Sequence, residues 1–277
     1  MVGKRKLMLI IALIAMFLLA AFYNGLVVRQ YTIETERLAA GESVRIVLVT
    51  DLHSHIYGKN QTGIIALIKK QNPDVIALAG DIVDDQAPIK GAEMFLTELK
   101  NIAPVYYVTG NHEFWSDDIA NIKKTIRQYG ITVLENNYEQ IMINNASIII
   151  GGVDDPEVVY EKPGYNWPEE ILHAFSALQN KPDYKILLSH RPELVEIYRE
   201  TCFDLVLSGH AHGGQVRIPF LLNGLYAPNQ GWFPPYAGGM YNHCSLTHIV
   251  SRGVSYNPRL PRIFNPPEIV VVEIKGL

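Results

Sequence analysis

Short apolar segments rich in β-branched residues alternate with helical segments over most of this chain, and this alternation restricts the fold more than any other feature. Five segments have the length and composition of buried strands: 45–50, 75–79, 105–108, 185–189 and 204–208. The range 62–71 has the apolar spacing of a helix and ends before Pro73. Strand–helix–strand units followed by strand-rich segments predict an α/β fold with two packed, mixed β-sheets flanked by helices.

Polar residues and glycines closely follow each of these five segments. They are Asp51-Leu52-His53, Gly80-Asp81, Gly110-Asn111-His112-Glu113, His190 and Gly209-His210-Ala211-His212-Gly213-Gly214-Gln215. Strands of an α/β sheet bring their carboxyl ends to one crevice, so side chains far apart in the sequence can meet there. Side chains two residues apart in an extended chain point the same way, so Asp-x-His and His-x-His can each direct two donors at one site.

The candidate metal ligands offer only oxygen and nitrogen donors. They are Asp51, His53, Asp81, Asn111, His190, His210 and His212. This mixture favours Mn, Fe or Zn over a thiolate site, and the histidines disfavour a pure Mg or Ca site. Because seven donors exceed the need of one ion, we expect two ions that share a carboxylate. Two ions about 3.5–4 Å apart can activate a water and hold the oxygens of an in-line displacement at phosphorus.

The motifs DLH, GD, GNHE, SH and GHAHGGQ, in this order and each after a strand, resemble those of the calcineurin-like metallophosphoesterase superfamily. The resemblance covers about residues 44–274. Within it, HGGQ, Ser251-Arg252-Gly253 and RIFNPPEI are similar to the bacterial membrane-anchored YkuE/YaeI-like branch. The resemblance implies a metal-dependent phosphoric ester hydrolase with two divalent or trivalent metal ions as cofactors.

The resemblance also implies a role for each motif residue. Asp51, His53 and His212 would hold one ion, Asn111, His190 and His210 would hold the other, and Asp81 would bridge them. His112 would bind no metal, but would stabilise or protonate the leaving oxygen of the phosphate. Asp84 matches the position that orients this histidine. The attacking group would be a hydroxide that bridges the two ions.

Three further expectations concern residues near the motifs. Protein phosphatases of the superfamily carry an arginine where this chain has Asp85, so a protein-phosphatase function is disfavoured, and we expect Asp85 to point away from the phosphate. We expect Glu113 to support its loop. We expect Trp167, Trp232, Phe233 and Tyr236 to pack in the core, with a substrate groove or lipid contact as alternatives.

The N-terminal segment differs in composition from the rest. Lys4, Arg5 and Lys6 precede the mostly apolar residues 7–28, and about 20 such residues cross a bilayer as a helix. We expect an uncleaved membrane anchor over 1–28, a short linker over 29–42 and a metallophosphoesterase domain over 43–277. The basic flank predicts a single-pass protein of the cell membrane, with a cytoplasmic N-terminus and an extracytoplasmic catalytic domain.

Composition narrows the function further. The formal net charge of −4 offers no basic footprint for nucleic acid, so no such partner is expected. Cys202 and Cys244 are too few for a disulfide scaffold or a cysteine zinc site, and whether they pair stays open. The leading hypothesis is a membrane-anchored dimetal phosphoesterase acting on a phosphomonoester, phosphodiester or pyrophosphate bond, with a phosphate-ester substrate that is lipid-linked or from the cell envelope. The alternative is a non-catalytic metal-binding adaptor on the same scaffold, which the complete set of ligands disfavours.

Overall fold

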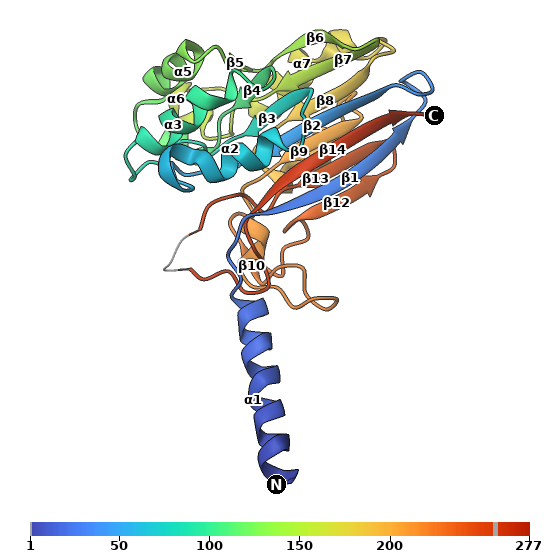
Figure 1. The fold of residues 1–277 in the computed structure, drawn as a ribbon. Coiled ribbons are helices and arrows are strands. Elements are labelled where there is room, and N and C mark those ends of the chain that lie inside the picture. Colours follow the sequence, from blue (N-terminus) through green and yellow to red (C-terminus); the bar gives the residue numbers. More distant parts are fainter. Residues whose placement is uncertain (1, 257–259) are drawn as a thin grey trace.

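A computed structural model describes residues 2–256 and 260–277, which form two six-stranded β-sheets packed face to face (Figure 1). The first sheet has the strand order β1-β14-β2-β3-β4-β5. Its strands are β1 (Val27–Thr35), β2 (Ser43–Val49), β3 (Val75–Ala79), β4 (Val105–Val108), β5 (Thr132–Val133) and β14 (Glu268–Gly276). From β2 to β5 all neighbours are parallel, while β14 is antiparallel to β2, so the sheet is mixed as predicted.

The second sheet has the strand order β12-β13-β9-β8-β7-β6. Its strands are β6 (Asn137–Ile143), β7 (Ala146–Gly152), β8 (Tyr184–Leu188), β9 (Leu205–Ser208), β12 (Gly239–His243) and β13 (Leu246–Val250). The four central strands run parallel and both edge strands are antiparallel to their neighbours. A separate small hairpin pairs β10 (Tyr226–Ala227) with β11 (Gly231–Trp232).

Alternation along the strands builds the core between the sheets. In β2, Val44, Ile46 and Leu48 face the second sheet, whereas Val47 and Val49 face the helices on the other side. Both sets are fully buried, which explains why the central strands are continuous apolar runs in the sequence.

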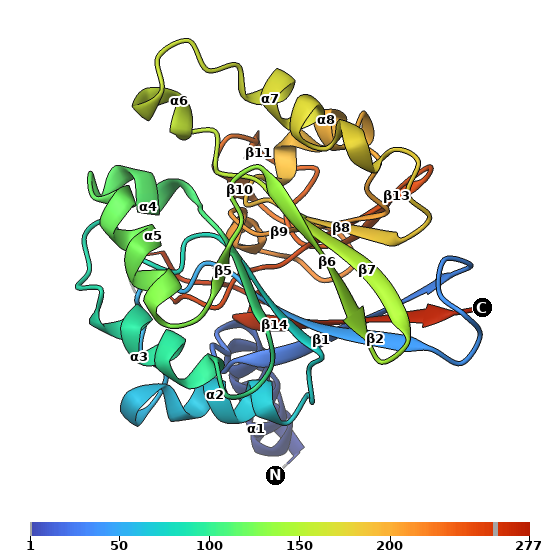
Figure 2. The same ribbon diagram turned by 90° about the horizontal axis from the view of Figure 1, so that it is seen from above.

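Helices cover both outer faces of the sandwich (Figure 2). The first sheet is covered by α2 (Thr62–Lys69), α3 (Lys90–Leu99) and α5 (Ile119–Gln128), and the second by α7 (Trp167–Ala174) and α8 (Val195–Arg199). Shorter helices are α4 (Asn111–Trp115), α6 (Val158–Glu161), η1 (Lys59–Gln61), η2 (Ser176–Leu178), η3 (Pro192–Leu194) and η4 (His212–Gly214). The predicted α/β sandwich flanked by helices is therefore confirmed.

The predicted linker is wrong over half of its length, residues 29–35. Residues 27–35 form β1, which pairs in parallel with β14 and closes one edge of the first sheet. Tyr31 and Ile33 pack against the core between the sheets, while Gln30, Thr32 and Glu34 are exposed. Side chains of a strand alternate between two faces, so every second residue of β1 is exposed and polar. These polar residues are why the sequence of this segment predicted a linker.

The apolar stretch 7–28 is divided between two elements. Helix α1 (Val2–Ala21) ends before Val27 and Val28 enter β1, because those two residues find ladder partners on β14. The helix extends away from the sandwich and meets it where the amide of Phe264 donates to the carbonyl of Ala21 (Figure 1). Among the described residues, no helix combines the length and the apolar character that crossing a membrane requires.

Candidate metal centre

The predicted site residues converge where the strands of both sheets end. Asp51 and His53 follow β2, Asp81 follows β3, Asn111 begins α4 behind β4, His190 follows β8, and His210 and His212 follow β9. Donor atoms of Asp51, His53 and His212 lie within 4.8 Å of one another, and so do those of Asp81, His190 and His210.

Asp81 and Asn111 connect these two donor groups. Asp81 Oδ2 lies 3.1 Å from Nε2 of His190 in one group and 3.7 Å from Nε2 of His53 in the other. Asp81 Oδ1 accepts the backbone N–H of His112 at 2.9 Å, so the start of α4 is held against the same carboxylate. Asn111 is buried there, and its Oδ1 has no hydrogen-bond partner among the described residues. Six of the seven predicted ligands thus lie in two neighbouring donor groups, and the seventh, Asn111, is buried at the start of α4 beside them.

Hydrogen bonds to the outer nitrogen of each ring fix which nitrogen faces the cluster. Nδ1 of His190 donates to the carbonyl of Ala79 at 2.8 Å, and Nε2 of His210 donates to the amide oxygen of Asn229 at 2.8 Å. The inner nitrogens, Nε2 of His190 and Nδ1 of His210, face each other at 3.2 Å. A cation between them would be held by both rings.

His53 has the same arrangement in the other donor group. Its Nδ1 donates to Asp84 at 3.0 Å, and its buried Nε2 has no hydrogen-bond partner within the described part of the chain. A histidine that binds a metal through one ring nitrogen usually donates the N–H of its other ring nitrogen to a carboxylate or a carbonyl. The buried Nε2 of His53 therefore fits a cation in the donor group that it forms with Asp51 and His212.

The electrostatics also favour cations at this position. Asp51 and Asp81 are buried beside each other, and burial raises the pKa of Asp51. Burial alone would lower the pKa of His190, but the Asp81 carboxylate outweighs it and raises this pKa to about 10. Without a metal, the site thus stabilises a positive charge on His190. A bound cation would neutralise the carboxylates of Asp51 and Asp81 in the same way.

The loops that carry the ligands are held in strained backbone conformations. Asp51, Asp81 and His210 have φ values of 55°, 53° and 66°, a region that residues other than glycine rarely adopt. Glu113 holds one of these turns, because its buried carboxylate accepts the backbone N–H groups of Asp81 at 3.0 Å and Gly110 at 2.8 Å. The prediction that Glu113 supports the loop is confirmed.

The turn at Gly110 leaves no space for a side chain. A Cβ atom there would lie 2.2 Å from Asp81 Oδ1, which is closer than any side chain tolerates. Gly110 therefore allows the start of α4 to approach the carboxylate at the centre of the cluster.

The surroundings of His112 differ from the prediction. Asp85, which was expected to point away, accepts a hydrogen bond from Nδ1 of His112 at 2.6 Å. Asp84, predicted to orient His112, lies 3.5 Å from the same nitrogen and is hydrogen-bonded to His53 instead. Asp84 Oδ1 accepts the backbone N–H groups of Gln86 and Ala87, and this turn directs its other oxygen to His53.

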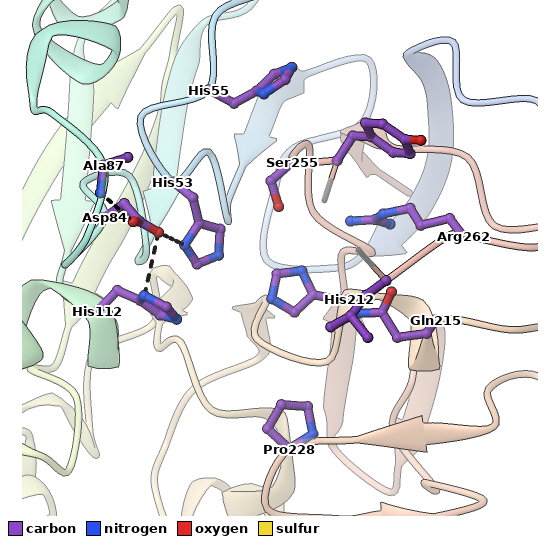
Figure 3. Close-up of a pocket in the computed structure, with 12 residues that line it drawn as sticks. His53, His55, Asp84, Ala87, His112, His212, Gln215, Pro228, Ser255 and Arg262 are labelled. Atoms are coloured by element: carbon purple, nitrogen blue, oxygen red, sulfur yellow. Dashed lines mark hydrogen bonds and ion pairs between the residues drawn. The ribbon is translucent and has the colours of Figure 1, made fainter. Parts of the chain in front are cut away.

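A cavity of about 440 Å³ opens beside the donor groups (Figure 3). His53, Asp84 and His112 form one wall in the figure, and His212, Gln215 and Arg262 lie opposite. The side chain of His112 is 24% exposed, so a molecule in the cavity can reach it, whereas His190 is closed off.

The structure also corrects the expectation for the aromatic residues. Trp167 is buried as expected, but Trp232 and Phe233 are 67% and 66% exposed. They lie in and next to the small β10–β11 hairpin, which is too short to cover them. No sequence signal indicated Asn229 of the same hairpin, whose role depends on its contact with His210.

A two-sheet sandwich whose strand ends hold two oxygen and nitrogen donor groups around one carboxylate defines a metal-dependent phosphoesterase. Comparisons with known proteins support this class. Residues 44–214 match the calcineurin-like phosphoesterase family. An uncharacterized metallophosphoesterase of Aquifex aeolicus is 31% identical over 90% of this chain and 92% of its own length. The uncharacterized metallophosphoesterase YkuE of Bacillus subtilis is 29% identical over 89% of this chain and 85% of its own.

The chain therefore belongs to the calcineurin-like phosphoesterase family, as the motifs predicted, and it is an enzyme of the metallophosphoesterase type. The fold also resembles the solved structure of the NAD nucleotidase NadN of Haemophilus influenzae. That similarity has a TM-score of 0.53 at 18% identity and covers 76% of this chain and 45% of that one.

Proposed function

We propose that this enzyme hydrolyses a P–O bond of a phosphoester, phosphodiester or pyrophosphate by in-line attack of water on phosphorus. The observation that carries the proposal is the pair of donor groups joined by Asp81, in which Nε2 of His53 is buried without a hydrogen-bond partner among the described residues. Two bound cations would supply Lewis-acid charge that activates a water and neutralises phosphate oxygens. The donor set supports Mn, Fe or Zn as these cations.

The side chains of the chain have distinct tasks in this proposal. The metal ligands are Asp51, His53, Asp81, Asn111, His190, His210 and His212. His112 faces the cavity, with its Nε2 4.0 Å from Asp81 Oδ2, and it donates a proton to the leaving oxygen. Asp85 holds the ring so that Nδ1 carries a proton and Nε2 faces the substrate.

The test is metal-dependent hydrolysis by the purified full chain. Metal-stripped protein is reloaded separately with Mn, Zn, Fe or Mg and given aryl phosphomonoesters, phosphodiesters and pyrophosphates. We expect turnover with at least one of Mn, Fe and Zn and loss of turnover on chelation. No turnover under any of these conditions would contradict the proposal and favour the adaptor.

The two neighbouring aspartates are expected to act on different histidines. Asp85→Asn should lower kcat on an alkyl phosphate by about 10- to 100-fold, because His112 loses the carboxylate that orients it. The loss should be smaller on a p-nitrophenyl ester, whose leaving group needs no proton. Asp84→Asn should instead weaken Mn binding by about 10- to 100-fold through His53, measured by metal titration.

Asp118→Asn is the matched control for both variants, because Asp118 is exposed and lies outside the cavity. Kinetics and metal affinity of this control should equal those of the unmodified chain. If Asp84→Asn alone showed the dependence on the leaving group, the assignment of the two aspartates would be reversed.

We further propose that the N-terminal segment, residues 1–28, attaches the enzyme to the cell membrane, with its basic end in the cytoplasm and the catalytic domain outside. Because α1 by itself falls short of a membrane-spanning helix, the residues that follow it would have to complete the crossing. Apolar side chains from Leu7 to Leu19 are exposed around α1, and Lys4, Arg5 and Lys6 precede them. Phe220, Leu221, Tyr226 and Trp232 add exposed apolar surface. Strand β10, which carries Tyr226, lies near the end of α1 in Figure 1. This surface supports a lipid-linked or cell-envelope substrate.

Cys244 offers a direct test of this location, because both cysteines are free and Cys244 is exposed. A membrane-impermeant maleimide added to spheroplasts should label Cys244, and the labelled chain should stay in the membrane fraction after a high-salt wash. Cys244→Ser is the control for the labelling site. Labelling only after lysis, or release of the chain by salt, would contradict the proposed location.

A further inference from the structure

The cavity has one wall that the proposed chemistry does not use. Opposite His112, the lining includes Gln215, Ser255 and Arg262, which are not among the candidate metal ligands. Arg262 is the first residue of the RIFNPPEI motif. Figure 3 shows its guanidinium directed between Ser255 and His212 into the cavity.

Arg262 is a buried, charged residue, and only some of its guanidinium N–H groups have hydrogen-bond partners in the described residues. It is 2% exposed, and its Nη1 donates to the carbonyl of Arg252 at 2.7 Å. Its buried Nη2 has no hydrogen-bond partner in the described residues, and no ion pair joins Arg262 to a carboxylate there. Burial lowers its pKa to about 10, so the side chain remains positively charged at neutral pH.

A structural role alone does not account for this arrangement. The neighbouring Arg252 shows how the fold neutralises the charge of a buried arginine, because it forms an ion pair with Glu268 at 2.8 Å. An unpaired guanidinium is costly to bury, and such groups persist where they meet a ligand.

The backbone around Arg262 is fixed to the loop that carries the metal ligand His212. Ile263 exchanges hydrogen bonds with this loop, donating to Gln215 at 3.1 Å and accepting from Arg217 at 2.9 Å. The side chain of Asn265 donates to the carbonyl of His212 at 2.8 Å. The position of Arg262 relative to the metal centre is therefore set by direct contacts.

We infer that Arg262 forms an anion-binding subsite beside the metal centre, where its Nη2 donates to a phosphoryl oxygen of the substrate. Arginine suits this task because its planar fork matches phosphate oxygens. The inference rests on the proposed phosphoester hydrolysis. The oxygen belongs either to the transferred phosphoryl group or to a second phosphoryl group next to it.

The experiment uses the full chain loaded with Mn, with Arg262→Gln and Arg262→Met as neutral variants. Inhibition by inorganic phosphate measures anion binding, and KM and kcat are determined for an aryl phosphomonoester and an aryl pyrophosphate. We expect phosphate binding to weaken by about 10- to 100-fold in both variants, the usual loss of a hydrogen bond to a charged group. Arg262→Lys should recover part of this loss, because it restores the charge without the fork.

The two substrates distinguish the two sources of the oxygen. Impaired hydrolysis of both would assign Arg262 to the transferred phosphoryl group, and a loss confined to the pyrophosphate would assign it to a second one. Arg199→Gln is the control, since Arg199 pairs with Glu196 on α8 outside the cavity. Melting temperatures of the variants are measured in phosphate-free buffer, so that weaker phosphate binding is read only from folded protein.

The inference is overturned if a folded Arg262→Gln or Arg262→Met variant keeps phosphate inhibition and KM within about twofold of the unmodified chain. If Arg262→Met does not fold, Arg262→Gln decides by the same criterion. An unmodified chain that hydrolyses neither substrate would instead contradict the proposed function, so the two failures can be told apart.

Discussion

Asp81→Asn is expected to abolish detectable phosphate release, whichever metal is loaded into the enzyme. Asparagine keeps the oxygen that accepts the N–H of His112, but it removes the negative charge between His53 and His190. Mutation of a residue that only hydrogen-bonds to a metal ligand lowers activity by about 10- to 100-fold. The loss of activity in Asp81→Asn should be larger, because both donor groups share this carboxylate. Metal content, measured by elemental analysis, should fall below two ions per chain.

A stability measurement separates this effect from misfolding. Burial alone would raise the pKa of Asp81, but the buried His190 outweighs it and holds this pKa well below its usual value, so the metal-free Asp81→Asn protein should melt at a lower temperature than the unmodified metal-free protein, and activity is compared well below that temperature. Asp118→Asn again serves as the exposed control. Unchanged turnover in a folded Asp81→Asn protein would refute the role of Asp81 and, with it, the shared metal centre.

His112→Gln should lower kcat on an alkyl phosphate by about 10²- to 10⁴-fold, the usual contribution of a positioned general acid. The reduction should shrink on a p-nitrophenyl ester, because that leaving group departs without a proton. His112 lies 4.0 Å from Asp81 through Nε2, yet its other nitrogen is held by Asp85 rather than directed at the cluster. Metal content should therefore stay at the level of the unmodified chain.

The metal content gives this prediction its second readout. Asp81, His53 and His112 also have donor atoms within 4.8 Å of one another, so a metal ligand role for His112 has a geometric basis. A lower metal content in His112→Gln, with equal losses of kcat on both esters, would show that His112 is a metal ligand and not the general acid. His173→Gln, on the exposed part of α7, is the matched control.

Much of the fold could be predicted because its central strands are buried on both faces. The bounds of β3 and β4 agree with the prediction, since an apolar run that ends at a polar motif marks the end of the strand directly. The candidate ligands could be named for a related reason. Every one of them is at or beyond a strand end, where a sheet brings distant residues together.

Edge elements and exposed loops could not be predicted in the same way. β1 alternates between polar and half-buried residues, and its pairing with β14 joins segments from opposite ends of the chain. The exposure of Trp232 and Phe233 depends on the size of the hairpin that carries them. Neither property is encoded within a short window of sequence.

By itself, the sequence determined the sandwich, the family and the set of oxygen and nitrogen donors, because burial and strand ends leave local patterns. Only the tertiary structure decided which neighbour each donor meets. Asp84 and Asp85 are adjacent in the chain, yet their hydrogen bonds go to different histidines because a turn at Gln86 and Ala87 fixes one of them. The buried guanidinium of Arg262, whose Nη2 has no partner among the described residues, is likewise visible only where the C-terminal segment folds against the His212 loop. Contacts of this kind depend on how distant segments are positioned relative to one another, which no local pattern specifies.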